Sequence, residues 1–228
     1  ILFGGKVMLE GNLLREYYPW KGEVSSTLSK PHNMLCSDGV FYFYPFYQYA
    51  VESAKKGVLP LWDIYVGGGT NFLGNVTFPF FYPGTFLFYL LRFQDAWDWT
   101  FFLHFFLAGL GMFAFLRTLN LSRYSSLIGS IVYNFGGFAF TFVWLNEHIY
   151  PFPWTPWVFF CWERYRQKRL KIYYLLTALL FAIQFSIGQH IFSYYLCLIF
   201  SLYFIYFHFP VIFNKDLHRN FLKGILEF

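Results

Sequence analysis

Charged residues are scarce in this chain of 228 residues, and their scarcity excludes an ordinary soluble domain. Asp, Glu, Lys and Arg together make up 13% of the sequence, whereas soluble domains carry about a quarter. Hydrophobic residues make up 57%, which is more apolar surface than a core of this size can hide. Lipid must therefore cover part of it, and the composition predicts an integral membrane protein built from helices.

Cysteine is also rare, and no pattern predicts a cofactor. Cys36, Cys161 and Cys197 are too scattered for a disulfide framework. His32 and Cys36 lack partners at the spacing of metal ligands, so we expect no metal. The net charge of +5 does not indicate nucleic acid, because the basic residues lie between apolar segments rather than in one patch. The chain does not begin with Met and shows no signal peptide, so we interpret it as a fragment.

Apolar segments long enough for membrane helices follow Asp98. The predicted spans are residues 99–116, 124–145 and 149–162, with two more inside residues 172–213. The last stretch has no Asp, Glu, Lys or Arg and is long enough for two spans of about 20 residues each.

The loops between these segments alternate in charge. Basic residues follow the first, third and fifth spans, whereas polar residues follow the second and fourth. The positive-inside rule puts the basic loops in the cytoplasm. Residues 1–97 then form an outer juxtamembrane subdomain, and residues 98–228 form a bundle of about five spans in the cytoplasmic membrane. Residues 78–93 are interpreted as a re-entrant or interfacial helix, because Pro79, Pro83 and Gly84 interrupt this apolar stretch. The alternative is a true span, which would place the first 77 residues inside, and their neutral charge balance does not decide between the two.

Local signals organise the outer region. Pro45 favours the first turn of a helix, and Lys55, Lys56 and Gly57 favour its end. The aromatic residues of this helix predict that it lies on the bilayer surface. The Leu-Pro step before Trp62 predicts extended chain, and the three glycines at residues 67–69 predict a turn.

Polar side chains at the predicted outer surface are the candidates for chemistry. They are Asp38, Glu147, His148, Gln189 and His190. Outer loops of packed helices lie near one another, so these residues can line one pocket. Asp38 suits general-base work, and the alternative is an ordinary Asp-Gly turn before a helix. For Glu147 and His148 the alternative is a solvated loop, and for His190 it is a helix cap.

Three further features lie in the predicted spans. His104 is an intramembrane ionisable residue and so a functional candidate by default, although a neutral imidazole bonded to a neighbouring helix is the alternative. Ser125 and Gly129 form a small-x-x-x-small pattern typical of close helix packing. Asn134-Phe135-Gly136-Gly137 interrupts the second span, and broken helices are typical of transporters.

Several strings resemble a known family. SDGVFYFYPF, GVLPLWDIYVGGGTNFLGN, FYPGTFLFYLL and LHFFLAGLGMFAFLRTLNLS resemble the YfhO-like family of bacterial polytopic membrane proteins in order and spacing. Trp154-x-Pro156 with Glu163 and Gly188-Gln189-His190 fall where the family has similar motifs. Two positions depart from its pattern, since Tyr42 stands where a Gln is expected and Asn12 replaces an Asp.

The resemblance implies an activity, because the family is placed among GT-C-type glycosyltransferases. These enzymes use a lipid-linked sugar and an acidic residue in the first large outer loop, which Asp38 matches. We expect transfer from a polyprenyl-phosphate donor to an acceptor at the outer face, with membrane lipid and the donor as partners. The remaining candidates would bind donor phosphate or sugar: Arg92, Lys55, Lys56, Glu147, His148, Gln189 and His190. The alternatives are a non-catalytic lipid or sugar transporter and an envelope-assembly scaffold.

Overall fold

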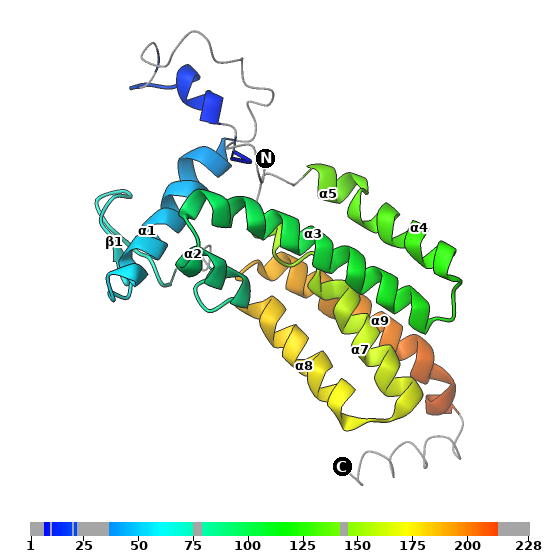
Figure 1. Cartoon of the computed structure of the whole chain (residues 1–228). Coiled ribbons are helices and arrows are strands. Elements are labelled where there is room, and N and C mark those ends of the chain that lie inside the picture. Colours follow the sequence, from blue (N-terminus) through cyan, green and yellow to red (C-terminus); the bar gives the residue numbers. More distant parts are fainter. Residues whose placement is uncertain are drawn as a thin grey trace. The chain divides into compact units, whose positions relative to one another are not determined.

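The structure, a computed structural model, describes residues 7–9, 11–19, 21, 37–74, 79–141 and 146–213 (Figure 1). These residues are mostly helical, which confirms the all-α class. Short helical segments are the 3₁₀ helices η1 (Gly11–Glu16) and η3 (Pro83–Phe86), the π-helix η2 (Gly39–Phe43), and α2 (Leu87–Leu90), α5 (Gly137–Thr141) and α6 (Asn146–Ile149). Longer helices are α1 (Tyr44–Lys55), α3 (Phe93–Thr118), α4 (Arg123–Asn134), α7 (Trp154–Lys168), α8 (Lys171–Ser186) and α9 (His190–Phe213).

The chain divides into two units, Ile1–Gln189 and His190–Phe228, and each is described by itself. Within the described part of the second unit, α9 is a single continuous helix. The first unit contains all other elements, so Asp38 and His148 belong to one body and His190 to the other.

The local predictions for the outer region are confirmed. Helix α1 has Pro45 in its first turn and ends at Lys55, with Gly57 in the left-handed region at φ +72°. The chain then runs extended into β1 (Trp62–Asp63), which pairs antiparallel with β2 (Thr70–Asn71). The three glycines between the strands all have positive φ, a conformation that costs glycine little.

The prediction that the aromatic face of α1 lies on a bilayer is wrong. Phe46 is 5% exposed and Tyr47 is fully buried. Phe46 stacks on Phe72 of the hairpin with ring centroids 4.1 Å apart, and Tyr47 packs edge-on against Trp97 of α3. Protein therefore covers this face of α1, and the helix is a core element of the first unit.

Residues 79–92 form neither a span nor one long helix. Phe78 lies outside the described residues, and the segment consists of turns, η3 and the four-residue α2. An α-helix of four residues is about 6 Å long, far short of a ~30 Å hydrocarbon core. Tyr82 and Phe88 point into the core, whereas Phe81 and Leu90 are exposed.

Among the described residues, two helices are long and apolar enough to cross a membrane, namely α3 and the part of α9 from His190 to Phe207. Helix α8 is apolar but shorter. The predicted second span is divided into α4 and α5 at Phe135 and Gly136. The predicted third span corresponds to α6 and α7, which are separated by a prolyl turn.

Small and polar residues let α4 and α7 approach α3 closely. A Cβ on Gly109 would lie 2.5 Å from the Asn134 side chain, and one on Gly111 would lie 2.7 Å from the Trp157 indole nitrogen. Ser130 donates to the Gly109 carbonyl at 2.7 Å, and Trp157 donates to the Leu107 carbonyl at 3.0 Å. The Ser125-x-x-x-Gly129 pattern correctly predicted that α4 packs closely against another helix, but Ser125 is not the serine that is buried there. Ser126 and Ser130 are buried, whereas Ser125 is exposed.

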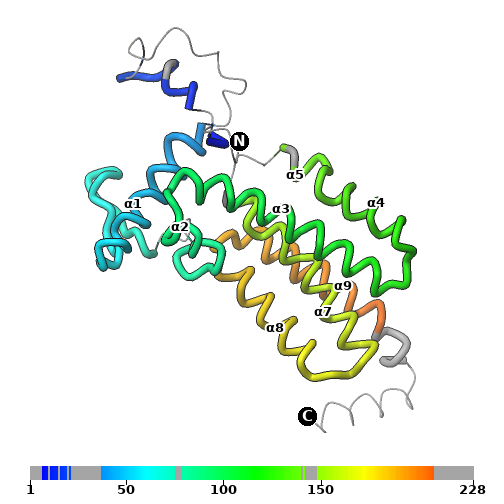
Figure 2. Tube along the Cα trace, in the orientation of Figure 1, coloured from blue at the N-terminus to red at the C-terminus, as the bar shows by residue number. Residues whose placement is uncertain are grey.

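An aromatic core joins the elements that precede α3 to the first half of that helix. It draws buried residues from η2, α1, the hairpin, α2, α3, α6 and the end of α8: Phe43, Phe46, Tyr47, Phe72, Tyr82, Phe88, Trp97, Phe101, Ile149, Tyr150 and Ile187. The tube in Figure 2 shows α1 and α2 gathered at the beginning of α3 and α4 and α7 extending along it, while α8 packs against α7. Asp38, which precedes η2, and His148, in α6, therefore belong to elements that contribute to the same core.

Candidate functional site

Asp38 stands at the start of a helical run and is exposed to solvent. Its φ and ψ of −60° and −34° are helical, and its side chain makes no capping hydrogen bond. The following five residues form the π-helix η2, whose Gly39 and Phe43 are buried in the core. The turn alternative placed Asp38 directly before a helix, and Asp38 does precede η2. Its side chain does not cap that helix. Among the described residues no hydrogen bond or ion pair to the Asp38 carboxylate is found.

The segment that begins with η1 packs against η2, the helix that Asp38 precedes. Tyr17, which follows η1, packs edge-on against Phe41 of η2 at 4.8 Å. Lys21 lies one turn further along, donating its backbone N–H to the Tyr17 carbonyl at 2.9 Å. Its ammonium group is 5.7 Å from the centre of the Tyr18 ring. The segment that carries Lys21 thus contacts η2 through Tyr17. Asn12 lies in η1.

The predicted phosphate-binding cations are placed apart from Asp38. Lys55 and Lys56 are exposed at the far end of the η2–α1 helical run, roughly 25 Å from its start at 1.5 Å per residue. They therefore do not face the same ligand atom as Asp38. Arg92 precedes α3 and is exposed, but it is paired with Asp95 at 2.7 Å. This hydrogen bond to the Asp95 carboxylate raises the pKa of the Arg92 guanidinium.

The other candidates lie on two separate units. His148 is half-buried in α6, and burial lowers its pKa below the usual value. The Glu147 side chain lies outside the described part of the chain, as do His32 and Cys36. Gln189 follows Ile187, a member of the aromatic core. His190 begins α9 in the other unit.

His104 is the centre of a buried polar chain that the sequence did not reveal. It is 2% exposed, and its Nδ1 lies 2.6 Å from the Thr100 carbonyl. Its Nε2 lies 2.5 Å from the Tyr82 hydroxyl, which also accepts the Trp154 indole N–H at 3.0 Å. The Tyr150 ring stacks on the imidazole with centroids 4.8 Å apart.

These contacts fix the protonation pattern of the chain. A carbonyl only accepts, so Nδ1 of His104 must carry the proton that it donates to Thr100. Neutral Nε2 then accepts from Tyr82, and Tyr82 accepts from Trp154. Every polar group is satisfied by a neutral partner, as burial requires. His104 therefore has the structural role of a neutral imidazole that connects α3 to the segment before η3 and to α7.

Sequence reasoning missed Tyr82, Trp154 and Lys21. Tyr82 and Trp154 belong to the strings FYPGTFLFYLL and Trp-x-Pro that carry the family resemblance. Their separation of 72 residues explains why the sequence gave no sign that they meet. Lys21 has no motif around it. Only the packing of Tyr17 on Phe41 shows that its segment contacts η2.

In the part of the chain that the structure describes, no three His, Cys, Asp or Glu side chains gather as metal ligands. No family model, curated protein or solved structure matches the chain.

Proposed function

We propose that the chain belongs to a membrane-spanning glycosyltransferase of the GT-C type, similar to the YfhO-like family. In this proposal Asp38 is the general base for sugar transfer from a polyprenyl-phosphate donor at the outer membrane face. The observation that carries it is the exposed Asp38 carboxylate at the start of a π-helical turn whose other face is packed in the core. π-Helical segments are frequent at functional sites.

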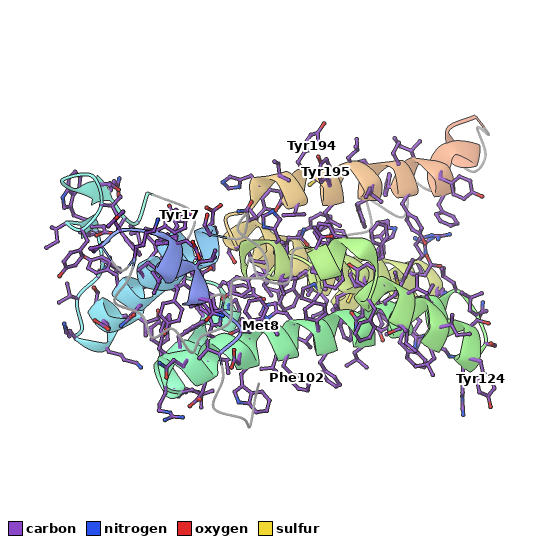
Figure 3. The ribbon with its side chains drawn as sticks, turned by 90° about the horizontal axis from the view of Figure 1, so that it is seen from above. Met8, Tyr17, Phe102, Tyr124, Tyr194 and Tyr195 are labelled. Atoms are coloured by element: carbon purple, nitrogen blue, oxygen red, sulfur yellow. The ribbon has the colours of Figure 1, made fainter. Side chains whose placement is uncertain are left out.

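The distribution of polarity in the first unit supports a multi-span arrangement. Large apolar side chains face outward along the helices, among them Phe102, Phe106, Leu110, Tyr124, Leu127, Ile128, Ile131, Leu175 and Leu179. Phe102 and Tyr124 project away from α3 and α4 in Figure 3. Some buried positions of the same helices hold polar side chains, including Thr100, His104, Ser126, Ser130, Thr177 and Gln184. A soluble domain buries its apolar side chains, whereas a bundle in lipid can expose them.

The proposed transfer is a single inverting displacement. Asp38 takes the proton of the acceptor hydroxyl as the hydroxyl oxygen attacks the anomeric carbon. The new glycosidic C–O bond forms while the bond to the donor phosphate breaks, and polyprenyl phosphate leaves as an anion. A cation near the leaving oxygen stabilises this charge. Lys21 is better placed for that role than Lys55 or Lys56, because its segment contacts η2 beside Asp38.

Asp38→Asn tests the proposal, because the amide keeps the shape of the side chain but cannot accept the proton. With full-length protein in liposomes containing a polyprenyl-phosphate sugar, transfer should fall by about 10²–10⁴. Glu52→Gln is the matched control, since Glu52 is an exposed carboxylate on the same helical run, and it should keep full transfer. Asp63 is unsuitable as a control because it is buried and accepts the Tyr65 N–H at 2.8 Å. Full transfer by Asp38→Asn would refute the assignment.

Donor choice tests the same function separately. The proposed site faces the outer side, where a sugar arrives only after being carried across on a lipid. The protein should therefore use the polyprenyl-phosphate donor and ignore the matching nucleotide sugar in detergent. Equal use of both donors would contradict the lipid-donor proposal.

A lipid or sugar transporter is the second candidate, and the break between α4 and α5 favours it. Asn134 ends α4, and its Nδ2 donates to the Phe105 carbonyl at 3.0 Å. Its Oδ1 is buried without a bonding partner among the described residues. Unwound helices with free polar atoms form substrate sites in transporters. Lipid movement across liposomes without any sugar transfer would favour this candidate.

A further inference from the structure

Basic residues gather at the end of the first unit where α3 and α7 finish. The exposed cations there are Arg117, Arg123, Lys168, Arg169 and Lys171. The acidic residue of the same region, Glu163, is buried and paired with Arg166 at 2.7 Å. Between residues 99 and 213 the sequence has one other acid, Glu147, which lies in α6. The exposed charge of these loops is therefore positive.

Two loops distant in sequence contribute these cations, and a hydrogen bond holds the loops together. Gln167 Nε2 donates to the Thr118 carbonyl at the end of α3 at 2.7 Å, and also contacts Glu163 Oε1 at 3.3 Å. Arg117 donates to the Leu121 carbonyl, which holds its guanidinium against the α3–α4 loop. Figure 1 shows the α3–α4 and α7–α8 connections at the same end of the unit. The cations form one rim.

Arg169 occupies a backbone position that disfavours a side chain. It follows α7 with φ +55° and ψ +24°, the left-handed conformation usually given to Gly or Asn at a helix end. Its guanidinium carbon lies 5.9 Å from the centre of the Tyr165 ring. An arginine at this position gives up backbone stability that glycine would provide. A function of the Arg169 charge would explain why arginine, rather than glycine, occupies this left-handed position.

Apolar and aromatic side chains lie directly beside the cations. Tyr124 is 82% exposed and follows Arg123, while Leu170 and Ile172 are exposed on either side of Lys171. A soluble anion would contact the charges alone. A phospholipid would also cover the apolar side chains with its acyl chains, and tyrosine is enriched at the level of the headgroups.

We propose that this basic rim, defined by Arg117, Arg123, Lys168, Arg169 and Lys171, binds the phosphate groups of anionic phospholipids. The inference uses the membrane-spanning arrangement proposed above but does not depend on Asp38 or on sugar transfer. The ligand is an anionic lipid such as phosphatidylglycerol, with its phosphate at the cations and its acyl chains along α4 and α8. Cations near an anionic membrane surface each strengthen such binding about fivefold.

The test compares phosphatidylglycerol with phosphatidylcholine on the purified full-length protein, with bound lipid counted by native mass spectrometry. The wild type should retain phosphatidylglycerol preferentially. Lys168→Gln/Arg169→Gln/Lys171→Gln should bind it about 100-fold more weakly. Lys168→Arg/Arg169→Lys/Lys171→Arg keeps the charge at the same positions and should bind as the wild type does. Equal phosphatidylglycerol binding by the Gln triple variant and the wild type would overturn the proposal.

Arg169→Gly separates the charge from folding. Glycine relieves the left-handed backbone, so the melting temperature in phosphatidylcholine should be equal to or above that of the wild type. Phosphatidylglycerol binding should nevertheless fall about fivefold. Unchanged phosphatidylglycerol binding would show that the Arg169 charge has no part in the rim. Both measurements are made without donor or acceptor, so a failure of the transferase proposal does not alter their outcome.

Discussion

Removing the Tyr82 hydroxyl should destabilise the protein more than removing any exposed tyrosine hydroxyl. This oxygen accepts from Trp154 and donates to His104, so Tyr82→Phe leaves two polar groups unpaired at once. Each buried unpaired group costs about 1–3 kcal/mol, so two of them give an expected loss of about 2–6 kcal/mol. His104 is 2% exposed, so water cannot replace the lost hydroxyl without a change in packing.

Two other tyrosines provide matched comparisons, because Tyr→Phe removes the same single oxygen. The Tyr133 hydroxyl donates to the Phe152 carbonyl at 2.8 Å, and Pro156 lacks the N–H that this carbonyl would otherwise accept four residues on. Tyr133→Phe therefore leaves one group unpaired and should cost about 1–3 kcal/mol. Tyr18 is 81% exposed, and Tyr18→Phe should change stability by less than about 0.5 kcal/mol.

Thermal unfolding in detergent, followed by circular dichroism, measures the series. The expected order of destabilisation is Tyr82 above Tyr133 above Tyr18. A Tyr82→Phe variant that unfolds at the same temperature as Tyr18→Phe would refute the buried chain through His104. It would also remove the main contact that we assign between the segment before η3 and α3.

Two further predictions concern packing and pH. Gly111→Ala should lower stability by about 1–3 kcal/mol in the same assay, because its Cβ would displace the Trp157 indole. Gly137→Ala, with nothing within 4 Å of its Cβ, should be neutral or stabilising. A destabilisation no greater for Gly111→Ala than for Gly137→Ala would contradict the close α3–α7 contact. Burial lowers the pKa of His148, so the unfolded state takes up its proton first and stability should fall as pH drops below about 6.5. His148→Gln should reduce the difference in melting temperature between pH 7.5 and pH 5.5. If this difference is as large in the variant as in the wild type, groups other than His148 cause the pH dependence of stability.

Features set by neighbouring residues were predictable from the sequence. Pro45 and Gly57 mark the ends of α1, and the glycines between Trp62 and Thr70 form the turn of the hairpin. Proline and glycine restrict or free the backbone wherever they occur, so these signals do not depend on tertiary contacts. Apolar segments likewise predicted where long helices lie, as for α3 and α9.

Features set by distant contacts were not predictable. The aromatic face of α1 has the composition of a surface helix, but Phe72 and Trp97 cover it. Composition shows that a face is apolar and does not show whether lipid or protein covers it. The small residues of α4 were recognised, yet the buried serine was misassigned by one position, because the facing helix decides which residues are buried. For the candidate site, Asp38 came from a motif, whereas Lys21 and Tyr82 depend on packing.

Membrane topology is the arrangement on which both the outer-face activity and the lipid-binding rim depend. Tyr18 and Tyr124 test it as a matched pair, because they are 81% and 82% exposed. Tyr18 belongs to the segment that contacts η2, and Tyr124 to the basic rim end of α4. Each is changed to cysteine in a background where Cys36, Cys161 and Cys197 are replaced by serine, and intact cells are treated with a membrane-impermeant maleimide. We predict that the Tyr18→Cys protein is labelled in intact cells and that the Tyr124→Cys protein is labelled only after permeabilisation. Labelling of both in intact cells, or of Tyr124→Cys alone, would contradict the proposed arrangement.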